Sequence, residues 1–316
     1  MLAPHSFLTL AGMRGAMTKI GFVGAGKIGA NAAYSTLHRI TSDVTEIAIV
    51  DIAEDLAIGE AMDLNTAAAG LGLPTKVVGG SDYGLLAGAD VVVVSAGLAR
   101  KPGMTREDLL AKNAGIIEDI TKKIFAVAPD TQMAIVSNPV DPLVYKAWKV
   151  SGKDRSKVYG MGALHDSMRL WDVLRDEVQA PVWNDAWILG NHGEQMFPAG
   201  SVAHTGGKTV DWADAKEKVR GRAINIIGKK GATYYAPGIA ISQMVLAAIG
   251  QGPKQYVPVV SVLQGEYGLK DVAVGVPAIL GRDGLERVIE VPLSSEDREW
   301  LDSAAKAISE QIASIA

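Results

Sequence analysis

The feature that most constrains the fold is an apolar segment near the N-terminus that runs into a glycine-rich turn. A predicted strand at residues 19–23 is followed by Gly-Ala-Gly-Lys-Ile-Gly and then by a predicted helix at residues 30–40. Gly24 permits the tight turn, Gly26 lets the backbone approach a pyrophosphate, and Gly29 allows the helix to pack closely on the strand. The order strand, glycine-rich turn, helix therefore predicts a dinucleotide-binding βαβ unit.

An acidic residue stands where such a unit needs one. A second predicted strand, residues 46–50, ends at Asp51, about twenty residues beyond the glycines. A carboxylate at this point accepts hydrogen bonds from both ribose hydroxyls of the adenosine and repels the 2′-phosphate of NADP. The pattern therefore favours NAD as the cofactor, and a purely structural βαβ unit is the alternative.

Strand and helix signals continue to alternate along the first half of the chain. Further strands are predicted at 76–78, 90–95 and 132–137, and helices at 54–67 and 106–128. This alternation predicts an α/β fold whose N-terminal part is a doubly wound parallel sheet of the Rossmann type. In such a sheet ligands bind outside the carboxyl ends of the strands, so the loops after Ser95 and Ser137 border the expected crevice.

The character of the sequence changes around Met161. Beyond it we expect an α+β domain with helices at 212–229, 239–250 and 296–315 and antiparallel strands at 256–263, 272–280 and 288–291. The predicted organisation is an N-terminal extension at 1–17, a dinucleotide-binding domain at 18–160 and a substrate and catalytic domain at 161–316.

Composition excludes several classes of function. The chain of 316 residues has no cysteine, so disulfides and thiolate metal sites are excluded. A formal charge of −4 with dispersed basic residues indicates neither a nucleic-acid nor a membrane surface, and no apolar run is long enough for a membrane span. We see no metal-ligand cluster, and we interpret the first sixteen residues as a non-targeting extension.

One histidine has the setting of a proton carrier. The chain has five histidines, so few side chains can exchange a proton near neutral pH. His192 stands between Gly190 and Gly193 in a polar loop that follows an apolar stretch. The glycines let the backbone turn tightly and leave the imidazole accessible to a ligand. His192 is therefore the candidate general base, and a turn residue is the alternative interpretation.

Two charged residues share one face of a predicted helix, GALHDSMRLWDVLRDEV. Asp166 and Arg169 are three residues apart, among apolar neighbours that indicate partial burial. A buried acid and a buried arginine both need partners, so Asp166 is a candidate to orient a histidine and Arg169 to bind a carboxylate. A surface ion pair is the alternative. His165 points roughly 100° away on the helix, and we interpret it as structural.

Two loops at the crevice carry candidate ligand-binding groups. The loop at 96–108 contains Arg100, Lys101 and Arg106, with the glycine and proline punctuation of a mobile lid. A cation opposes the dipole at a helix N-terminus, so Arg106 there points to anion binding, with a solvated basic loop as the alternative. Asn138, held by a following proline, either donates to a ligand oxygen or forms a turn.

From about residue 18 to the C-terminus, the order and spacing of these motifs resemble the lactate/malate dehydrogenase family. Asp166, Arg169 and His192 fall where the family places its orienting acid, its carboxylate clamp and its proton carrier. The segment from Ala96 to Arg106 resembles the family's substrate lid. The matched cofactor-binding positions are Gly24, Ala25, Gly26, Lys27, Ile28, Gly29, Asp51, Asn113, Val136, Ser137 and Asn138.

The resemblance implies hydride transfer between NAD and a 2-hydroxy acid, with His192 accepting the hydroxyl proton and Asp166 stabilising the imidazolium. Arg169 would bind the C1 carboxylate, and Arg106 and Asn138 the C2 oxygen. Arg100 stands where family members that act on malate pair the C4 carboxylate, which implies oxidation of malate to oxaloacetate and the reverse reaction. A cytoplasmic homotetramer of the tricarboxylic acid cycle is implied as well.

Two features depart from this pattern. The catalytic loop reads Asn-His-Gly-Glu-Gln, with Glu194 as its acid, where the family usually has Gly-His-Gly-Asp-Thr, and His165 replaces a leucine directly before Asp166. Thr233 is more familiar from the lactate branch. A lactate or other 2-hydroxy acid dehydrogenase therefore stays an alternative, as does a non-catalytic dinucleotide-binding module. The absence of cysteine argues against the NAD-dependent glycoside hydrolases of related fold, which use a cysteine metal ligand.

Overall fold

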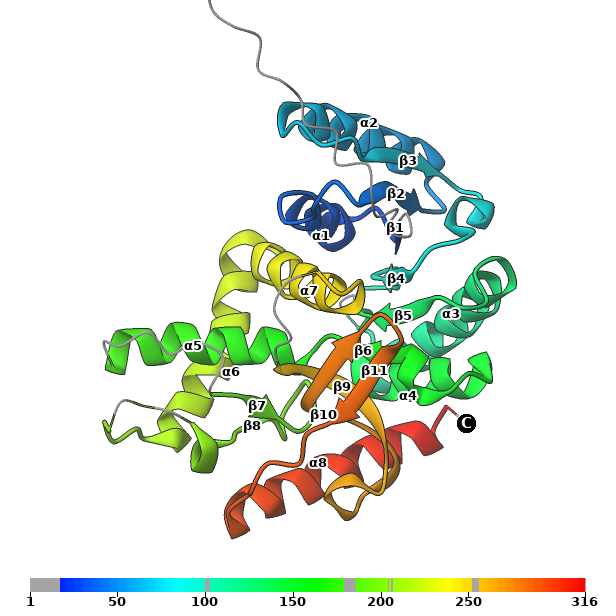
Figure 1. The fold of residues 1–316 in the computed structure, drawn as a ribbon. Coiled ribbons are helices and arrows are strands. Elements are labelled where there is room, and N and C mark those ends of the chain that lie inside the picture. The colour runs from blue at the N-terminus through cyan, green and yellow to red at the C-terminus, as the bar shows by residue number, and fades with distance from the viewer. Residues whose placement is uncertain are drawn as a thin grey trace, which may run out of the picture.

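One nine-stranded sheet runs through the protein (Figure 1). The computed structural model describes residues 18–99, 103–178, 186–203, 205, 207–251 and 256–315. Six strands form a parallel section in the order β6-β5-β4-β1-β2-β3, and β9, β10 and β11 continue it as an antiparallel section beside β6. A separate small ribbon is made by β7 and β8.

The parallel section confirms the predicted doubly wound sheet. Its elements are β1 Thr18–Val23, α1 Lys27–Leu37, β2 Val44–Val50, α2 Glu54–Gly70, β3 Lys76–Gly80, β4 Val91–Val94, α3 Arg106–Val127, β5 Gln132–Ile135, α4 Val140–Ser151 and β6 Val158–Gly160. The strands of the centre are uninterrupted apolar runs such as Val91–Val94, because helices bury both faces of a parallel sheet.

The second half adds the antiparallel strands and the remaining helices. Its elements are α5 Ala163–Val178, β7 Ile188–Leu189, β8 Phe197–Pro198, α6 Trp212–Lys230, α7 Tyr235–Ala248, β9 Tyr256–Gln264, β10 Lys270–Gly281, β11 Gly284–Val288 and α8 Ser295–Ala313. Strand β9 pairs with β10 over the whole length of β9, and α8 packs along β10. Apolar side chains from β1, β9 and α8 belong to one continuous core, so both halves share it.

Three differences from the predicted elements have local causes. Helix α4 was not predicted and α7 begins earlier than predicted, in both cases because a proline, Pro142 or Pro237, lies in the first helical turn, where it is tolerated. The predicted hairpin partner of β10 is present, but its predicted bounds of 288–291 are wrong: β11 is Gly284–Val288, because Gly284, with a positive φ of 107°, allows the chain to return directly after β10. Within the described part of the chain, no helix has the length and apolar character needed to cross a bilayer.

Candidate functional site

The glycine-rich turn between β1 and α1 leaves open space in front of a helix N-terminus. Gly24 has a φ of 109°, which favours glycine. A Cβ at Gly29 would lie 1.8 Å from the Gly24 carbonyl oxygen, so α1 packs against the turn as closely as backbone allows. A Cβ at Gly26, by contrast, would meet nothing within 4 Å, and no side chain caps α1. Free N–H groups facing open space fit a pyrophosphate.

Asp51 lies at the end of β2, beside this turn. Its Oδ2 accepts a hydrogen bond from the Ala25 N–H at 2.7 Å, and its Oδ1 accepts one from the Ala53 N–H at 2.9 Å. These bonds hold the half-buried carboxylate in place, and each oxygen keeps a further lone pair. The carboxylate thus lies beside the glycine-rich turn with lone pairs left over, and its contact with ribose hydroxyls stays a prediction.

Two side chains connect the loops that follow β4 and β5. The Asn113 amide of α3 accepts from the Leu98 N–H at 2.8 Å and donates to the Asn138 carbonyl oxygen at 2.6 Å. The Ser137 hydroxyl donates to the Ala96 carbonyl oxygen at 2.5 Å. Asn113, Ser137 and Val136 are all buried. Asn113 and Ser137 thus shape the crevice through the backbone, and their direct contact with a cofactor stays a prediction.

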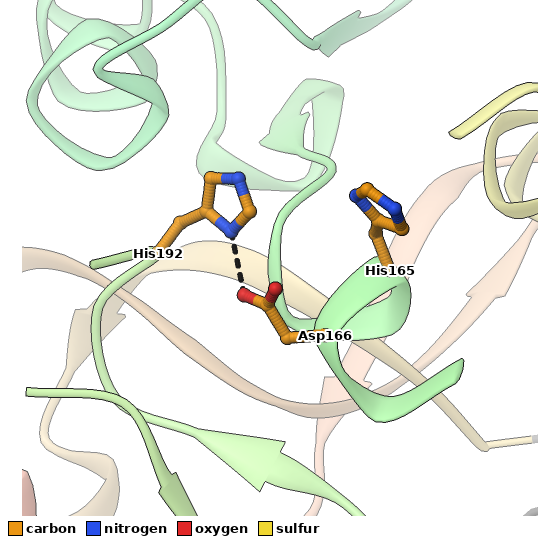
Figure 2. Close-up of side chains that lie close together, drawn as sticks. All are labelled: His165, Asp166 and His192. Carbon is orange, nitrogen blue, oxygen red and sulfur yellow. Dashed lines mark hydrogen bonds and ion pairs between the residues drawn. The ribbon is translucent and has the colours of Figure 1, made fainter. Parts of the chain in front are cut away.

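The structure brings His192 and Asp166 together, although they belong to different elements (Figure 2). Asp166 lies in the first turn of α5, and His192 follows β7. The His192 Nδ1 and the Asp166 Oδ2 are 2.5 Å apart. The other Asp166 oxygen accepts from Arg169 Nη1 at 2.7 Å, so the buried carboxylate joins a ring and a guanidinium. The buried Arg169 Nε has no partner among the described residues, so this guanidinium keeps donors for a ligand.

Opposite charges decide the protonation of this pair. Burial alone would raise the pKa of Asp166, but His192 and Arg169 outweigh it and hold the pKa below its ordinary value. Burial alone would lower the pKa of His192, but the charge of Asp166 and its hydrogen bond outweigh it, and the pKa is raised. Asp166 is therefore ionised near neutral pH, and it favours the imidazolium form of His192.

Asp141, which the sequence predictions missed, supports His192 from the other side. Its Oδ2 accepts from the His192 backbone N–H at 2.9 Å, and its Oδ1 has no partner within the described part of the chain. Burial raises the pKa of Asp141 to about 6. An acid in the first turn of a helix is usually explained by the helix dipole, so the sequence shows no sign of this second role.

His165 is buried beside the pair, as a structural residue would be. Its ring centroid lies 6.3 Å from that of His192, and its Nε2 is buried without a hydrogen-bond partner among the described residues. Burial, together with the Arg169 charge, lowers the pKa of His165 to about 3. The ring is therefore neutral at physiological pH.

A cavity of about 660 Å³ opens in front of His192. Arg106 and Asn138 line it with the histidine, and the C-terminal end of α8 closes one side. Arg106 Nη1 forms an ion pair with Glu194 Oε1 at 2.8 Å, with both side chains more than half exposed. The unusual Glu194 is thus the partner of the arginine that opens α3.

The remaining predicted residues lie elsewhere. Arg169 contacts Asp166 but is not among the residues that line the cavity. The half-buried Thr233 does not line the cavity either. Arg100 and Lys101 fall outside the described residues.

Comparisons with known proteins agree along the whole described chain. Residues 18–160 match the family model described as lactate/malate dehydrogenase, NAD binding domain, and residues 166–316 match lactate/malate dehydrogenase, alpha/beta C-terminal domain. The malate dehydrogenase of Archaeoglobus fulgidus is 50% identical over 93% of this chain and 98% of its own length. That of Thioalkalivibrio sulfidiphilus is 37% identical over 94% of this chain and 99% of its own.

Solved structures give the same result. The Archaeoglobus fulgidus malate dehydrogenase in complex with NADH superposes with a TM-score of 0.88 at 49% identity, covering 94% of this chain and 99% of that one. A lactate dehydrogenase from a deep-sea metagenome library superposes with a TM-score of 0.87 at 32% identity, covering 94% and 98%. The glycine-rich turn, the continuous sheet and both family matches lead to one conclusion: the chain belongs to the lactate/malate dehydrogenase family.

Proposed function

We propose that this protein catalyses the NAD-dependent oxidation of malate to oxaloacetate, and the reverse reaction, with His192 as the proton carrier. The observation that carries the proposal is the hydrogen-bonded pair of His192 and Asp166 at the wall of a cavity that Arg106 and Asn138 also line. Similarity to malate dehydrogenases at 50% identity supports the choice of substrate.

The proton moves at the ring nitrogen that Asp166 leaves free. With Asp166 ionised, the His192 Nδ1 carries a hydrogen and donates it to the carboxylate, so Nε2 holds the lone pair of the neutral ring. In malate oxidation Nε2 accepts the proton of the C2 hydroxyl, and the carboxylate stabilises the imidazolium that forms. NAD, when bound, supplies the hydride acceptor. In oxaloacetate reduction the imidazolium returns the proton.

Three other side chains orient the substrate. Arg169 has a planar fork with donors left over, which suits the C1 carboxylate. Arg106 and Asn138 donate to the C2 oxygen, where negative charge develops during reduction. Arg106 has to leave Glu194 to do so, and an exposed ion pair of this kind is weak, worth about 0–1 kcal/mol. The arginine is therefore free to move onto a bound substrate.

Arg100 is proposed to select the dicarboxylate by pairing with its C4 carboxylate. With pyruvate bound, closure would bury this arginine without a partner, at a cost of about 2–5 kcal/mol, or roughly 30-fold to several thousand-fold in rate. The rival proposal is a lactate-type enzyme, which the overall fold does not distinguish because a lactate dehydrogenase superposes with a TM-score of 0.87.

The test follows NADH consumption with oxaloacetate and, separately, with pyruvate. The wild type is compared with Arg100→Gln and with Lys101→Gln, which removes the neighbouring positive charge as a matched control. We expect a strong oxaloacetate preference in the wild type and in Lys101→Gln, and a weakened one in Arg100→Gln. Equal or greater activity with pyruvate would establish the lactate-type function instead. Binding of NADH without turnover of either acid would identify a non-catalytic module.

We further propose that the protein is a homotetramer. Large apolar side chains are exposed on α2, α6 and α7, among them Met62 at 67%, Ile224 at 73% and Tyr235 at 66%. Where such side chains form a contiguous patch, an assembly commonly covers it. Light scattering on the purified protein would measure the mass, and a monomer or a dimer would contradict the proposal.

A further inference from the structure

The fold assembles a group of three potential metal ligands that the sequence does not reveal. His165 and Asp166 are neighbours in the first turn of α5, whereas His192 comes from the loop after β7. One donor atom of each residue lies within 4.8 Å of the other two. Figure 2 shows the two imidazole rings side by side above the Asp166 carboxylate. Two nitrogens and one oxygen thus surround a common point.

We propose that His165, Asp166 and His192 form a binding site for a zinc-like transition-metal ion, which inhibits the enzyme when it binds. Imidazole nitrogen and carboxylate oxygen are the ligands that Zn²⁺ takes besides thiolate. The proposed proton transfer uses Asp166 and His192 but has no task for His165. A buried imidazole with a nitrogen that lacks a hydrogen-bond partner among the described residues is costly, and a ligand role accounts for it.

A metal ion and the hydrogen between His192 and Asp166 cannot occupy the site at the same time. Zn²⁺ binds nitrogen and oxygen at about 2.0–2.2 Å, so the three donors have to draw closer than their present spread by rotation of the two rings. The His192 Nδ1 and the Asp166 Oδ2 are 2.5 Å apart and share a hydrogen bond. A metal ion between these two atoms would replace the hydrogen. A bound ion therefore blocks proton transfer at His192.

The surroundings set the strength of the site. His192 lines the cavity and its side chain is 18% exposed, whereas His165 and Asp166 are buried, so the His192 ring has to turn for an ion to enter from the cavity. Arg169 opposes the ion, because its guanidinium already pairs with Asp166 at 2.7 Å. The site should consequently bind more weakly than a closed structural zinc site, and reversibly.

The experiment measures metal binding directly on tag-free protein treated with a chelator. Zn²⁺ binding is followed by calorimetry, and Co²⁺ binding by the visible absorption of a low-symmetry nitrogen and oxygen site. His165→Leu is the test variant, because leucine fills a similar buried volume. His38→Leu is the control, since His38 lies beyond α1 with its ring against Tyr34 and outside the group.

We expect His165→Leu to bind Zn²⁺ at least about tenfold more weakly than the wild type, since removal of even a supporting residue costs 10–100-fold. His38→Leu should bind like the wild type. Added Zn²⁺ should inhibit NADH consumption by the wild type and by His38→Leu at concentrations that leave His165→Leu active. Unchanged affinity in His165→Leu would overturn the proposal, and so would a wild type that binds no Zn²⁺.

Two provisions keep the test decisive. If His165→Leu proves unfolded by circular dichroism, His165→Gln takes its place with the same expected weakening. The binding measurements do not depend on turnover. If the protein binds zinc through His165 but does not reduce oxaloacetate, the proposed function is refuted and the metal site stands. If it reduces oxaloacetate but binds no zinc, the metal site is refuted and the proposed function stands.

Discussion

His192 is held between two buried carboxylates that act on it differently. Asp166 contacts the ring and is the main cause of its raised pKa, to which the charge of Asp141 adds. Asp141 also accepts from the backbone N–H, which fixes the position of the loop. The proposed proton transfer needs both the ring and its position, so we expect the two acids to give different phenotypes when they are neutralised.

Neutralising Asp166 should change the pH dependence as well as the rate. In Asp166→Asn, His192 loses the charge that raises its pKa and stays beside Arg169, so its pKa falls. Malate oxidation needs the neutral ring, so the acid limb of its kcat/KM profile should move to lower pH. Oxaloacetate reduction needs the imidazolium, so its alkaline limb should move the same way. The rate should fall by about 10²–10⁴.

The matched control for this variant is Asp172→Asn, a half-buried acid of the same helix that pairs with Arg175 and Arg222 away from His192. Its pH profiles and rate should equal those of the wild type. An acid limb that stays in place in Asp166→Asn would show that another group than His192 produces it.

Neutralising Asp141 should stabilise the fold at neutral pH. An acid whose pKa rises from 3.8 to about 6 on folding lowers the stability by up to about 3 kcal/mol at pH 7. An amide oxygen in Asp141→Asn still accepts from the His192 N–H without that charge. Thermal unfolding should therefore show a gain above about pH 6, which vanishes as the pH falls towards 4 because the wild-type acid becomes protonated. A variant less stable than the wild type at pH 7 would contradict this.

Residues on one periodic element were the easiest to predict from the sequence. Asp166 and Arg169 are three apart on a helix, so helical geometry alone placed them on one face, where the structure pairs them. Asp141 and Glu194 could not be predicted in the same way, since their partners, the His192 backbone and Arg106, are distant in sequence. Their contacts depend on how separate loops meet.

At the scale of elements, the turn between β1 and α1 contains one glycine that folding requires, Gly29, and one that cofactor binding is proposed to require, Gly26. A Cβ at Gly29 collides with the Gly24 carbonyl oxygen, which is backbone and cannot rotate away. Gly29→Ala should lower the stability by about 1–3 kcal/mol or more. Gly26 has an ordinary φ of −69° and open space beside it, so Gly26→Ala should fold normally.

Cofactor binding should distinguish the two glycines further. The methyl group of Gly26→Ala occupies the space proposed for the pyrophosphate, which in such turns lies directly against the backbone of this glycine. The NADH affinity of the variant should therefore drop at least about tenfold. Fluorescence titration with NADH and thermal unfolding would be measured on both variants. Wild-type affinity in Gly26→Ala would mean that the phosphates bind elsewhere.

Elements that follow hydrophobic periodicity were predicted well, and those that begin with proline were not. The fold class and the central strands follow from short apolar runs of β-branched residues such as Val91–Val94, which are typical of a strand buried on both faces. Helix α4 was missed because Pro139 and Pro142 read as a stiff turn, and both are compatible with a helix start. Short strands such as β6 carry too few residues to show a period.

At the scale of the whole molecule, the proposed division near residue 160 runs through one sheet. Strand β6 ends the parallel section and pairs with β9 at Gly160 and Val260. The buried Tyr159 shares a core with Val259 and Leu301 from the second half. The two domains proposed from the sequence are thus expected to depend on each other for folding.

A fragment of residues 18–160 should therefore fail to fold as a soluble unit. It would expose the edge of β6 and the apolar surface that β9 and α8 cover, and unpaired edges of this kind aggregate. Size-exclusion chromatography and NADH titration of the expressed fragment test this. A monomeric fragment that binds NADH would show that the first half is autonomous.

The β-bridge between Gly190 and Gly275 fixes the position of the loop that carries His192. Each glycine donates its N–H to the carbonyl oxygen of the other, so the chain just before His192 is fastened to β10, a strand of the main sheet. His192, the proposed proton carrier, and the glycine-rich turn are thereby both attached to the nine-stranded sheet. Arg106, by contrast, lies at the surface in an exposed ion pair. If Arg100 selects the substrate as proposed, exchange of the segment between β4 and α3 should change which 2-hydroxy acid is oxidised and leave His192, Asp166 and the glycine-rich turn in place.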